Sequence, residues 1–182
     1  IFAASLKQHG IGRKCLAPFF LIFCLFVSCG AKPNPNIILI SIDTCRADYL
    51  NCYGAKKNYT PHLNTLAAQS ALFRNAVSPV PLTTPAHSSL LTGMNPYSHG
   101  VRDNNYRLPD SFLTLPEILR ASGYRTAAVV SAFPMDSRFG LDQGFEEYYD
   151  HSFEKLLKDE YHERRGKDTS KLAIDWLRDC TA

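Results

Sequence analysis

The chain has 182 residues, of which 45% are hydrophobic and 20% charged, a composition that allows one modest domain with a buried core. Its formal charge of +3 comes from the start of the chain, where Lys7, Arg13 and Lys14 are the only charged side chains before Lys32. The remainder is close to neutral and has no basic stripe with interleaved aromatic residues. These features argue against a nucleic-acid partner.

Residues 1–29 are predicted to be a signal peptide. A basic patch, GIGRK, precedes an apolar run that is shorter than the about 20 residues of a membrane-spanning helix. The run ends in FVSC, which resembles a bacterial lipoprotein signal with Cys29 as the lipidated residue. An ordinary secretory signal, a short anchor and a buried helix remain as alternatives. We expect an exported protein that a lipid on Cys29 anchors to the membrane of the cell envelope, with residues 30–35 as a linker.

The first strand of the domain is predicted at residues 36–43, NIILISID. This run is apolar without alternation and ends in Asp43, a pattern typical of a strand that is buried on both faces of a mostly parallel sheet. In such sheets ligands bind at the carboxyl ends of the strands. Asp43 is therefore a candidate ligand-binding residue, although an acid after a strand is often only a turn residue.

The rest of the chain alternates between helical and strand-like segments. Proline near a predicted start and glycine after a predicted end, as at Pro61 and Gly93, are typical helix signals. The elements in chain order are helix 60–70, strand 71–77, a helix from near Pro85 to Gly93, helix 111–123, strand 124–132, a charged helix over 154–166 and an amphipathic helix over 170–179. This alternation predicts an α/β fold with a mostly parallel central sheet and flanking helices.

Two threonines, Thr83 and Thr84, lie just before Pro85 at the start of a predicted helix. The N-terminus of a helix presents unpaired backbone N–H groups and the positive end of its dipole, so it can hold an anion. A hydroxyl at this place can cap the helix or attack an anion bound there. The local sequence alone favours a cap.

Three longer stretches decide between these interpretations. SIDTCRADYLNCYG, TTPAHSSLLTGMNPYSHGVRDN and ASGYRTAAVV occur in this order, and together they resemble the alkaline phosphatase superfamily of metal-dependent hydrolases, which includes the sulfatases and phosphodiesterases. The resemblance implies that residues 36–182 are the N-terminal part of a sulfatase-like hydrolase domain. Such domains take further Asp and His metal ligands from later sequence, so we expect this chain to be an inactive fragment of a longer enzyme.

The resemblance also implies roles for single residues. Asp43 matches a metal ligand, Thr83 matches the nucleophile that also binds metal, and Asn104 matches a contact to a substrate oxygen. Thr84 is left as a residue of the helix start. His87 stands where sulfatases have arginine; it either supports the site by hydrogen bonding from outside the ligand set or has a structural role only. Because sulfatases place cysteine or serine at the position of Thr83, the site is more similar to the phosphodiesterase branch.

The implied activity is hydrolysis of phosphate or sulfate esters, with phosphate preferred, in a small molecule, glycan or lipid. The resemblance implies divalent metal ions as cofactors, which would be zinc, manganese or calcium. A threonine bound to such an ion would attack the ester and form a covalent intermediate that water then hydrolyses. A phosphoryl transferase of the same superfamily and a non-catalytic remnant remain as alternatives.

Overall fold

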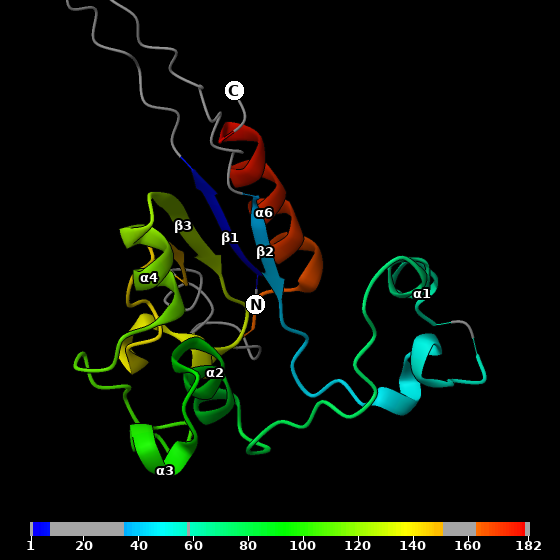
Figure 1. Cartoon of the computed structure of the whole chain (residues 1–182), viewed down its shortest axis with the longest axis horizontal. Helices are drawn as coiled ribbons and strands as arrows, with labels where there is room; N and C mark the ends of the chain where they lie inside the picture. Colours follow the sequence, from blue (N-terminus) through cyan, green and yellow to red (C-terminus); the bar gives the residue numbers. More distant parts are fainter. Residues whose placement is uncertain (1, 8–34, 58, 151–162, 181–182) are drawn as a thin grey trace, which may run out of the picture.

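The computed structural model describes residues 2–7, 35–57, 59–150 and 163–180. Four strands form one sheet in the order β2-β1-β3-β4 (Figure 1). The strands are β1 (Phe2–Lys7), β2 (Ile37–Ile40), β3 (Tyr124–Val129) and β4 (Glu147–Tyr149). β1 is antiparallel to β2 and β3, whereas β3 and β4 are parallel. β2, β3 and β4 therefore run in the same direction, and β1 makes the sheet mixed.

Five helices accompany the sheet in the described part of the chain. They are α1 (Pro61–Ala68), α2 (Thr83–Thr92), α3 (Pro96–His99), α4 (Leu115–Ala121) and α6 (Gly166–Asp179). Short 3-10 turns cover Ala47–Tyr49, Asn51–Tyr53, Phe133–Met135 and Ser137–Phe139. Helices and strands together confirm the predicted α/β class. Within the described ranges, no helix is both long and apolar enough to cross a membrane.

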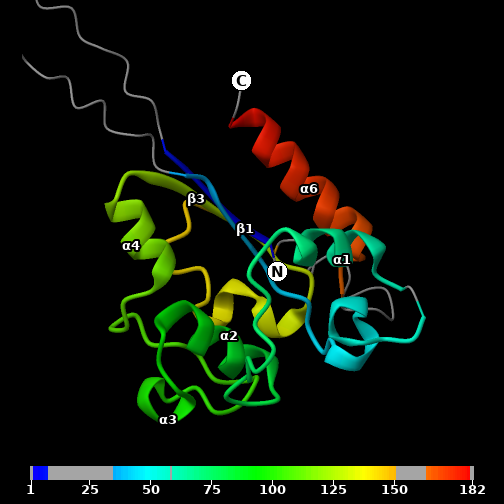
Figure 2. The same cartoon turned by 45° about the vertical axis from the view of Figure 1, so that its right-hand side comes forward.

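Helices pack on both faces of the sheet, because neighbouring residues of β3 point in opposite directions. Ala127 contacts Trp176 of α6. Ala128 faces the opposite way, toward Leu91 of α2 and Val130. The larger core cluster lies on this second face and consists of Leu91, Val101, Leu108, Val130, Met135 and Leu141. Figure 2 shows α4 and α6 on either side of the strands. β3, in which every residue except Arg125 is buried, is therefore the buried centre of the fold.

The first predicted strand differs from expectation in length and burial. β2 spans only Ile37–Ile40 of the predicted range 36–43 and lies at the edge of the sheet. Ile38 and Ile40 share the face on which α6 packs against β1 and β3, and their side chains are 51% and 62% exposed. The expectation of a central strand buried on both faces is thus wrong within the described residues, because β2 lies at the edge of the sheet, where other described elements leave Ile38 and Ile40 largely uncovered.

The other helices and strands predicted from the sequence have mixed outcomes. The helices ending at Gly93 and Gly123 and the amphipathic helix near the C-terminus are confirmed. Residues 71–77 form no strand; they are an irregular segment with a turn, and Phe73 and Val77 are exposed. Most of the predicted helix 154–166 lies outside the described residues.

Two further predictions concern the ends of the predicted domain. The predicted signal peptide, 1–29, is described only at residues 2–7, which form β1. Residues 8–34, which include Cys29 and most of the predicted linker, lie outside the described part.

A long connection over residues 44–80 carries α1 away from the sheet (Figure 1), and none of its described residues is buried.

Candidate active site

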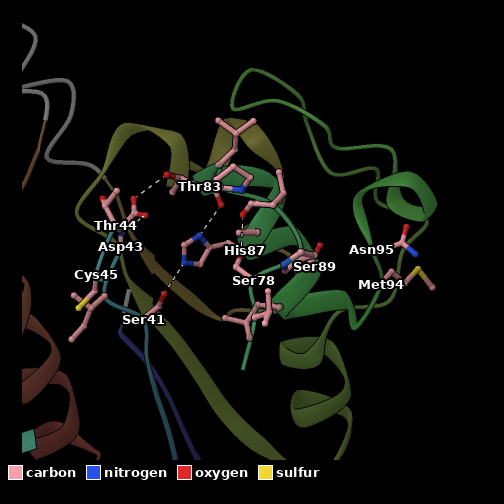
Figure 3. A pocket seen from close by; sticks show the side chains of 18 of the residues that line it. Ser41, Asp43, Thr44, Cys45, Ser78, Thr83, His87, Ser89, Met94 and Asn95 are labelled. Atoms are coloured by element: carbon pink, nitrogen blue, oxygen red, sulfur yellow. Dashed lines mark hydrogen bonds between the residues drawn. The ribbon is translucent and has the colours of Figure 1, made fainter. Parts of the chain in front are cut away.

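The Thr83 hydroxyl and the Asp43 carboxylate meet at one end of the sheet. Thr83 is the first residue of α2, and Asp43 follows the end of β2 after a short extended stretch. Thr83 Oγ1 donates a 2.9 Å hydrogen bond to Asp43 Oδ2 (Figure 3). The structure therefore brings together the two side chains that the sequence singled out, although forty residues separate them in the chain.

The backbone next to Asp43 has an unusual conformation. Thr44 has a φ of +52°, the only positive φ of a non-glycine residue in the described chain. A β-branched residue rarely adopts this left-handed region, and the conformation costs on the order of 1–2 kcal/mol. It allows the Thr44 N–H to donate a 2.9 Å hydrogen bond to Asp43 Oδ1. Each carboxylate oxygen of Asp43 thus has one donor, and the carboxylate is held in a fixed orientation.

Thr84 has a structural role that differs from that of its neighbour. Its side chain is fully buried, and its Oγ1 lies 2.7 Å from the Pro134 carbonyl oxygen and 3.1 Å from that of Asn104. Its backbone N–H donates a 3.0 Å hydrogen bond to Asn104 Oδ1. Thr84 thus bonds the start of α2 to the segments around Asn104 and Pro134. The half-buried Thr83 is the hydroxyl that faces the cavity described below.

Asn104 supplies the cap that α2 lacks locally. The residue before the helix, Leu82, has no side-chain acceptor for the first N–H groups. Asn104 Oδ1 takes this place from a distant loop by accepting from Thr84. Since a backbone N–H can bond only to the amide oxygen, the Nδ2 donors of Asn104 point away from Thr84. Asn104 therefore lies at the N-terminus of α2, but it is not among the residues that line the cavity described below, and its contact to a substrate oxygen stays a prediction.

His87 lies one helical turn after Thr83 and is 6% exposed. Its Nδ1 is 2.7 Å from the Thr83 carbonyl oxygen, and its Nε2 is 2.9 Å from Ser41 Oγ. Burial lowers the pKa of His87, and the hydrogen bond to the Thr83 carbonyl opposes this effect only in part. The imidazole is thus neutral near pH 7 and lies between the Thr83 carbonyl oxygen and Ser41 Oγ.

Ser41 did not stand out in the sequence. The one available signal is its position two residues before Asp43, because side chains two apart in an extended chain point to the same side. The structure confirms this relation: Ser41 reaches His87 and Asp43 reaches Thr83, both on α2, whereas Ile42 between them is 56% exposed.

A cavity of about 870 Å³ opens beside these residues. It lies between residues 41–46, residues 77–83 and one face of α2, and both Asp43 and Thr83 line it. Much of the remaining wall is apolar, as at Val80 and Leu90. A molecule in this cavity would contact the Thr83 hydroxyl and the Asp43 carboxylate.

The donor types at the site suit a hard divalent cation. Asp43 and Thr83 offer a carboxylate and a hydroxyl oxygen, and oxygen donors of this kind suit calcium and manganese. Within the described ranges, no group of three or more His, Cys, Asp or Glu side chains gathers to hold a metal. Calcium takes about six to eight oxygen ligands, so these residues fit such an ion in kind and would supply two of its ligands.

Comparison with known proteins identifies relatives for most of the chain from residue 35 onward. The sulfatase family model matches residues 35–176. A Formosa agariphila protein named ulvan-active sulfatase is 43% identical over 94 residues, covering 52% of this chain and 18% of that protein. Human N-acetylgalactosamine-6-sulfatase is 32% identical over 136 residues, covering 66% of this chain and 26% of that protein. Human arylsulfatase A is 36% identical over 116 residues, covering 60% of this chain and 23% of that protein.

The chain spans about a fifth to a quarter of the length of these curated relatives. No solved structure matches it.

Proposed function

The chain belongs to the sulfatase family, and from this premise we propose that it carries the nucleophile of an ester hydrolase, namely the Thr83 hydroxyl. The observation that carries the proposal is the 2.9 Å hydrogen bond from Thr83 Oγ1 to Asp43 Oδ2 at the first turn of α2. The positive end of the helix dipole lies at this turn and favours an anionic ester group. Of the first three residues of α2, only Thr83 would offer its N–H to that group, because the Thr84 N–H is bonded to Asn104 and Pro85 has none.

The proposed reaction has two steps. Thr83 Oγ1 attacks the sulfur or phosphorus atom, its proton moves to the Asp43 carboxylate, and the bond to the alcohol oxygen of the ester breaks as that oxygen takes up the proton. Water then attacks the same atom, the bond to Thr83 Oγ1 breaks, and a proton of the water restores the threonine hydroxyl while sulfate or phosphate is released. The Asn104 amide would hold an oxygen of the ester group in both steps. A divalent cation held by Asp43 and Thr83 would lower the pKa of the hydroxyl and offset the charge of the ester oxygens.

Two observations bear on which ester is cleaved. The names of the curated relatives, all sulfatases, support a sulfate ester of a small molecule or glycan. The residues of the site favour a phosphate ester, because Thr83 stands where sulfatases have cysteine or serine and the buried, neutral His87 stands in place of their arginine. We favour the phosphate ester, at an envelope location set by the lipid on Cys29.

The test compares three chromogenic esters. The complete product of the gene is assayed with p-nitrophenyl phosphate, bis-p-nitrophenyl phosphate and p-nitrophenyl sulfate, each with added calcium, manganese or zinc and after chelation. We expect phosphate turnover to exceed sulfate turnover and to need the added ion. Thr83→Ala should lower kcat/KM at least about a hundredfold. Thr65→Ala, which removes an exposed hydroxyl of α1, serves as the control and should leave turnover unchanged.

Each outcome has a separate meaning. Preferred sulfate turnover would contradict the choice of a phosphate ester and leave the nucleophile in place. Full turnover by Thr83→Ala would contradict the nucleophile itself.

A further inference from the structure

We propose that Ser41 and His87 form a bridge of hydrogen bonds with fixed proton positions, and that this bridge positions the Thr83 hydroxyl against Asp43. The inference rests on the proposed function only in taking Thr83 as the reacting group. The bridge joins the stretch after β2 to the first turn of α2, the two segments that supply Asp43 and Thr83.

The partners of the imidazole fix its protons. Nδ1 of His87 faces the carbonyl oxygen of Thr83, which can only accept, so Nδ1 carries the hydrogen. The neutral ring then has a bare Nε2, and Ser41 Oγ at 2.9 Å must donate to it. The direction of the whole bridge follows: Ser41 donates to His87, and His87 donates to Thr83.

A second buried histidine has the opposite arrangement. His99 Nδ1 accepts the backbone N–H of Val101 at 3.1 Å, so its hydrogen lies on Nε2 and points to Ser89 Oγ at 2.9 Å. Burial lowers the pKa of His99, as it does for His87. The molecule thus contains two serine–histidine pairs in which the proton sits on different ring nitrogens, and the His99 pair serves as an internal reference.

The two ends of the bridge lie next to Thr83 and Asp43, the proposed reacting pair. One end is the carbonyl of Thr83, the same residue whose hydroxyl reaches Asp43, and the other end is Ser41, two residues before Asp43. A planar ring with a hydrogen bond at each end holds these segments at a fixed spacing. Without Ser41, the spacing would lose its buried hydrogen bonds and keep the bond between the half-buried Thr83 and the exposed Asp43. Both Ser41 and His87 are therefore positioning residues.

The first test measures the bridge without any activity. Nitrogen-15 spectra of the 182-residue chain, recorded well above the ordinary histidine pKa of about 6.5, distinguish a protonated from a bare ring nitrogen. We expect His87 to be protonated at Nδ1 and His99 at Nε2. Ser41→Ala should shift the Nε2 signal of His87 and leave His99 unchanged, and Ser89→Ala should do the reverse. A His87 ring protonated at Nε2 in the unaltered chain would overturn the bridge.

The second test measures positioning. Three-bond couplings of Thr83 report its χ1 rotamer, which should be single in the unaltered chain and averaged in Ser41→Ala. Ser41→Thr keeps the hydroxyl and should restore the single rotamer. Ser122→Ala, which removes a hydroxyl bonded to Ile118 of its own helix, is the matched control and should change nothing. A single Thr83 rotamer in Ser41→Ala would overturn the positioning role.

Kinetics of the complete gene product then separate this inference from the proposed function. Ser41→Ala should lower kcat about tenfold to a hundredfold with KM unchanged, because misplacement of a reacting group costs rate rather than binding. His87→Asn keeps the donor to Thr83 and loses the acceptor for Ser41, so the double variant should be no slower than either single variant. If Thr83→Ala is inactive and Ser41→Ala has full kcat, positioning is wrong and the proposed function stands. If Thr83→Ala stays fully active, the proposed function is wrong, whereas the two spectroscopic tests still decide the bridge and its effect on Thr83.

Discussion

Asn104 accepts a 3.0 Å hydrogen bond from the backbone N–H of Thr84 and so caps a helix that begins about twenty residues earlier in the chain. The same side chain is the proposed contact to an ester oxygen. The cap uses the amide oxygen, and the ester contact would use the amide nitrogen, so suitable substitutions separate the two roles.

We expect Asn104→Ala to lower both stability and turnover. Loss of a helix cap costs about 1 kcal/mol of unfolding free energy. Asn104→Asp keeps an oxygen acceptor and adds a negative charge that the helix N-terminus favours, so its stability should stay within about 0.5 kcal/mol of the unaltered chain. Its turnover of an anionic ester should still fall, because the N–H donors are gone. Urea unfolding and ester hydrolysis measure the two effects, and Asn105→Asp, an exposed neighbour, controls for the added charge.

The two adjacent threonines should respond in opposite ways to the same substitution. Thr84→Val removes a fully buried hydroxyl and leaves the Pro134 carbonyl without its donor, which should lower the unfolding free energy by about 1–3 kcal/mol. Thr83→Val removes a half-buried hydroxyl and should cost less than about 1 kcal/mol while abolishing turnover. Urea denaturation of both variants checks the contrast. Equal destabilisation by the two substitutions would show that Thr83 is also structural.

The left-handed backbone at Thr44 predicts a stabilising substitution. Asn adopts positive φ more readily than a β-branched residue, so Thr44→Asn should raise the unfolding free energy by up to about 1 kcal/mol. Thr44→Gly relieves the same strain but adds freedom to the unfolded chain, so its gain should be smaller. Thr65→Gly in the interior of α1 is the matched control and should lose about 1 kcal/mol. Loss of stability in Thr44→Asn would count against strain at this position.

Acid should release α6 from the sheet. Glu147 accepts hydrogen bonds from the Tyr149 hydroxyl, from Trp176 Nε1 at 2.8 Å and from Arg125 at 3.0 Å, and these bonds lower the pKa of its carboxyl below 4.5. A carboxyl whose pKa is lower in the folded state contributes stability that is complete above the unfolded value and is lost as the pH falls through the folded value. We therefore expect the contact to weaken below about pH 4.5.

Trp176 is the only tryptophan of the chain, so its fluorescence reports this contact. Glu147→Gln should remove the acid transition between neutral pH and pH 3, whereas Glu146→Gln should keep it. An unchanged transition in Glu147→Gln would assign it to another group.

The predicted lipid anchor has its own test. Cells that express the gene and are fed a palmitate analogue should label the unaltered protein and not Cys29→Ala. Cys24→Ala, an earlier cysteine of the leader, is the control and should keep the label. Equal labelling of Cys29→Ala would contradict the lipoprotein interpretation.

Local signals in the sequence were sufficient for most helices. Gly93 and Gly123 end α2 and α4 with positive φ values, and α4 starts with a capping box between Thr114 and Glu117. These signals act within a few residues, so the sequence displays them directly. The prediction of a strand at residues 71–77 was wrong. A strand also needs a neighbouring strand to pair with, and no local sequence pattern reveals whether one is present.

The site was predictable only in part, because sequence motifs reveal single residues but not the contacts between distant ones. Asp43 and Thr83 were found through motifs, and the structure places them in contact. Neither the Ser41–His87 bond nor the bond from Thr84 to Asn104 was foreseen, because these contacts link residues 46 and 20 positions apart. Such contacts depend on how β2, α2 and a distant loop pack together. The burial of Ile38 and Ile40 was also misjudged, since an apolar strand is covered only where other elements reach it.

If residues 1–29 are the leader that the sequence predicts, β1 links the fold of this chain to its export. Its residues, Phe2–Lys7, belong to the predicted leader, yet they pair with both β2 and β3. A precursor that has closed this sheet cannot thread through a translocation channel, and a leader held by the export machinery cannot complete the sheet. Cleavage before Cys29 would leave β2 and β3 two strand spacings, about 10 Å, apart. Because both run in the same direction, a chain cleaved there has the strand orientation for a parallel β2–β3 pair, a pairing that the uncleaved chain does not have.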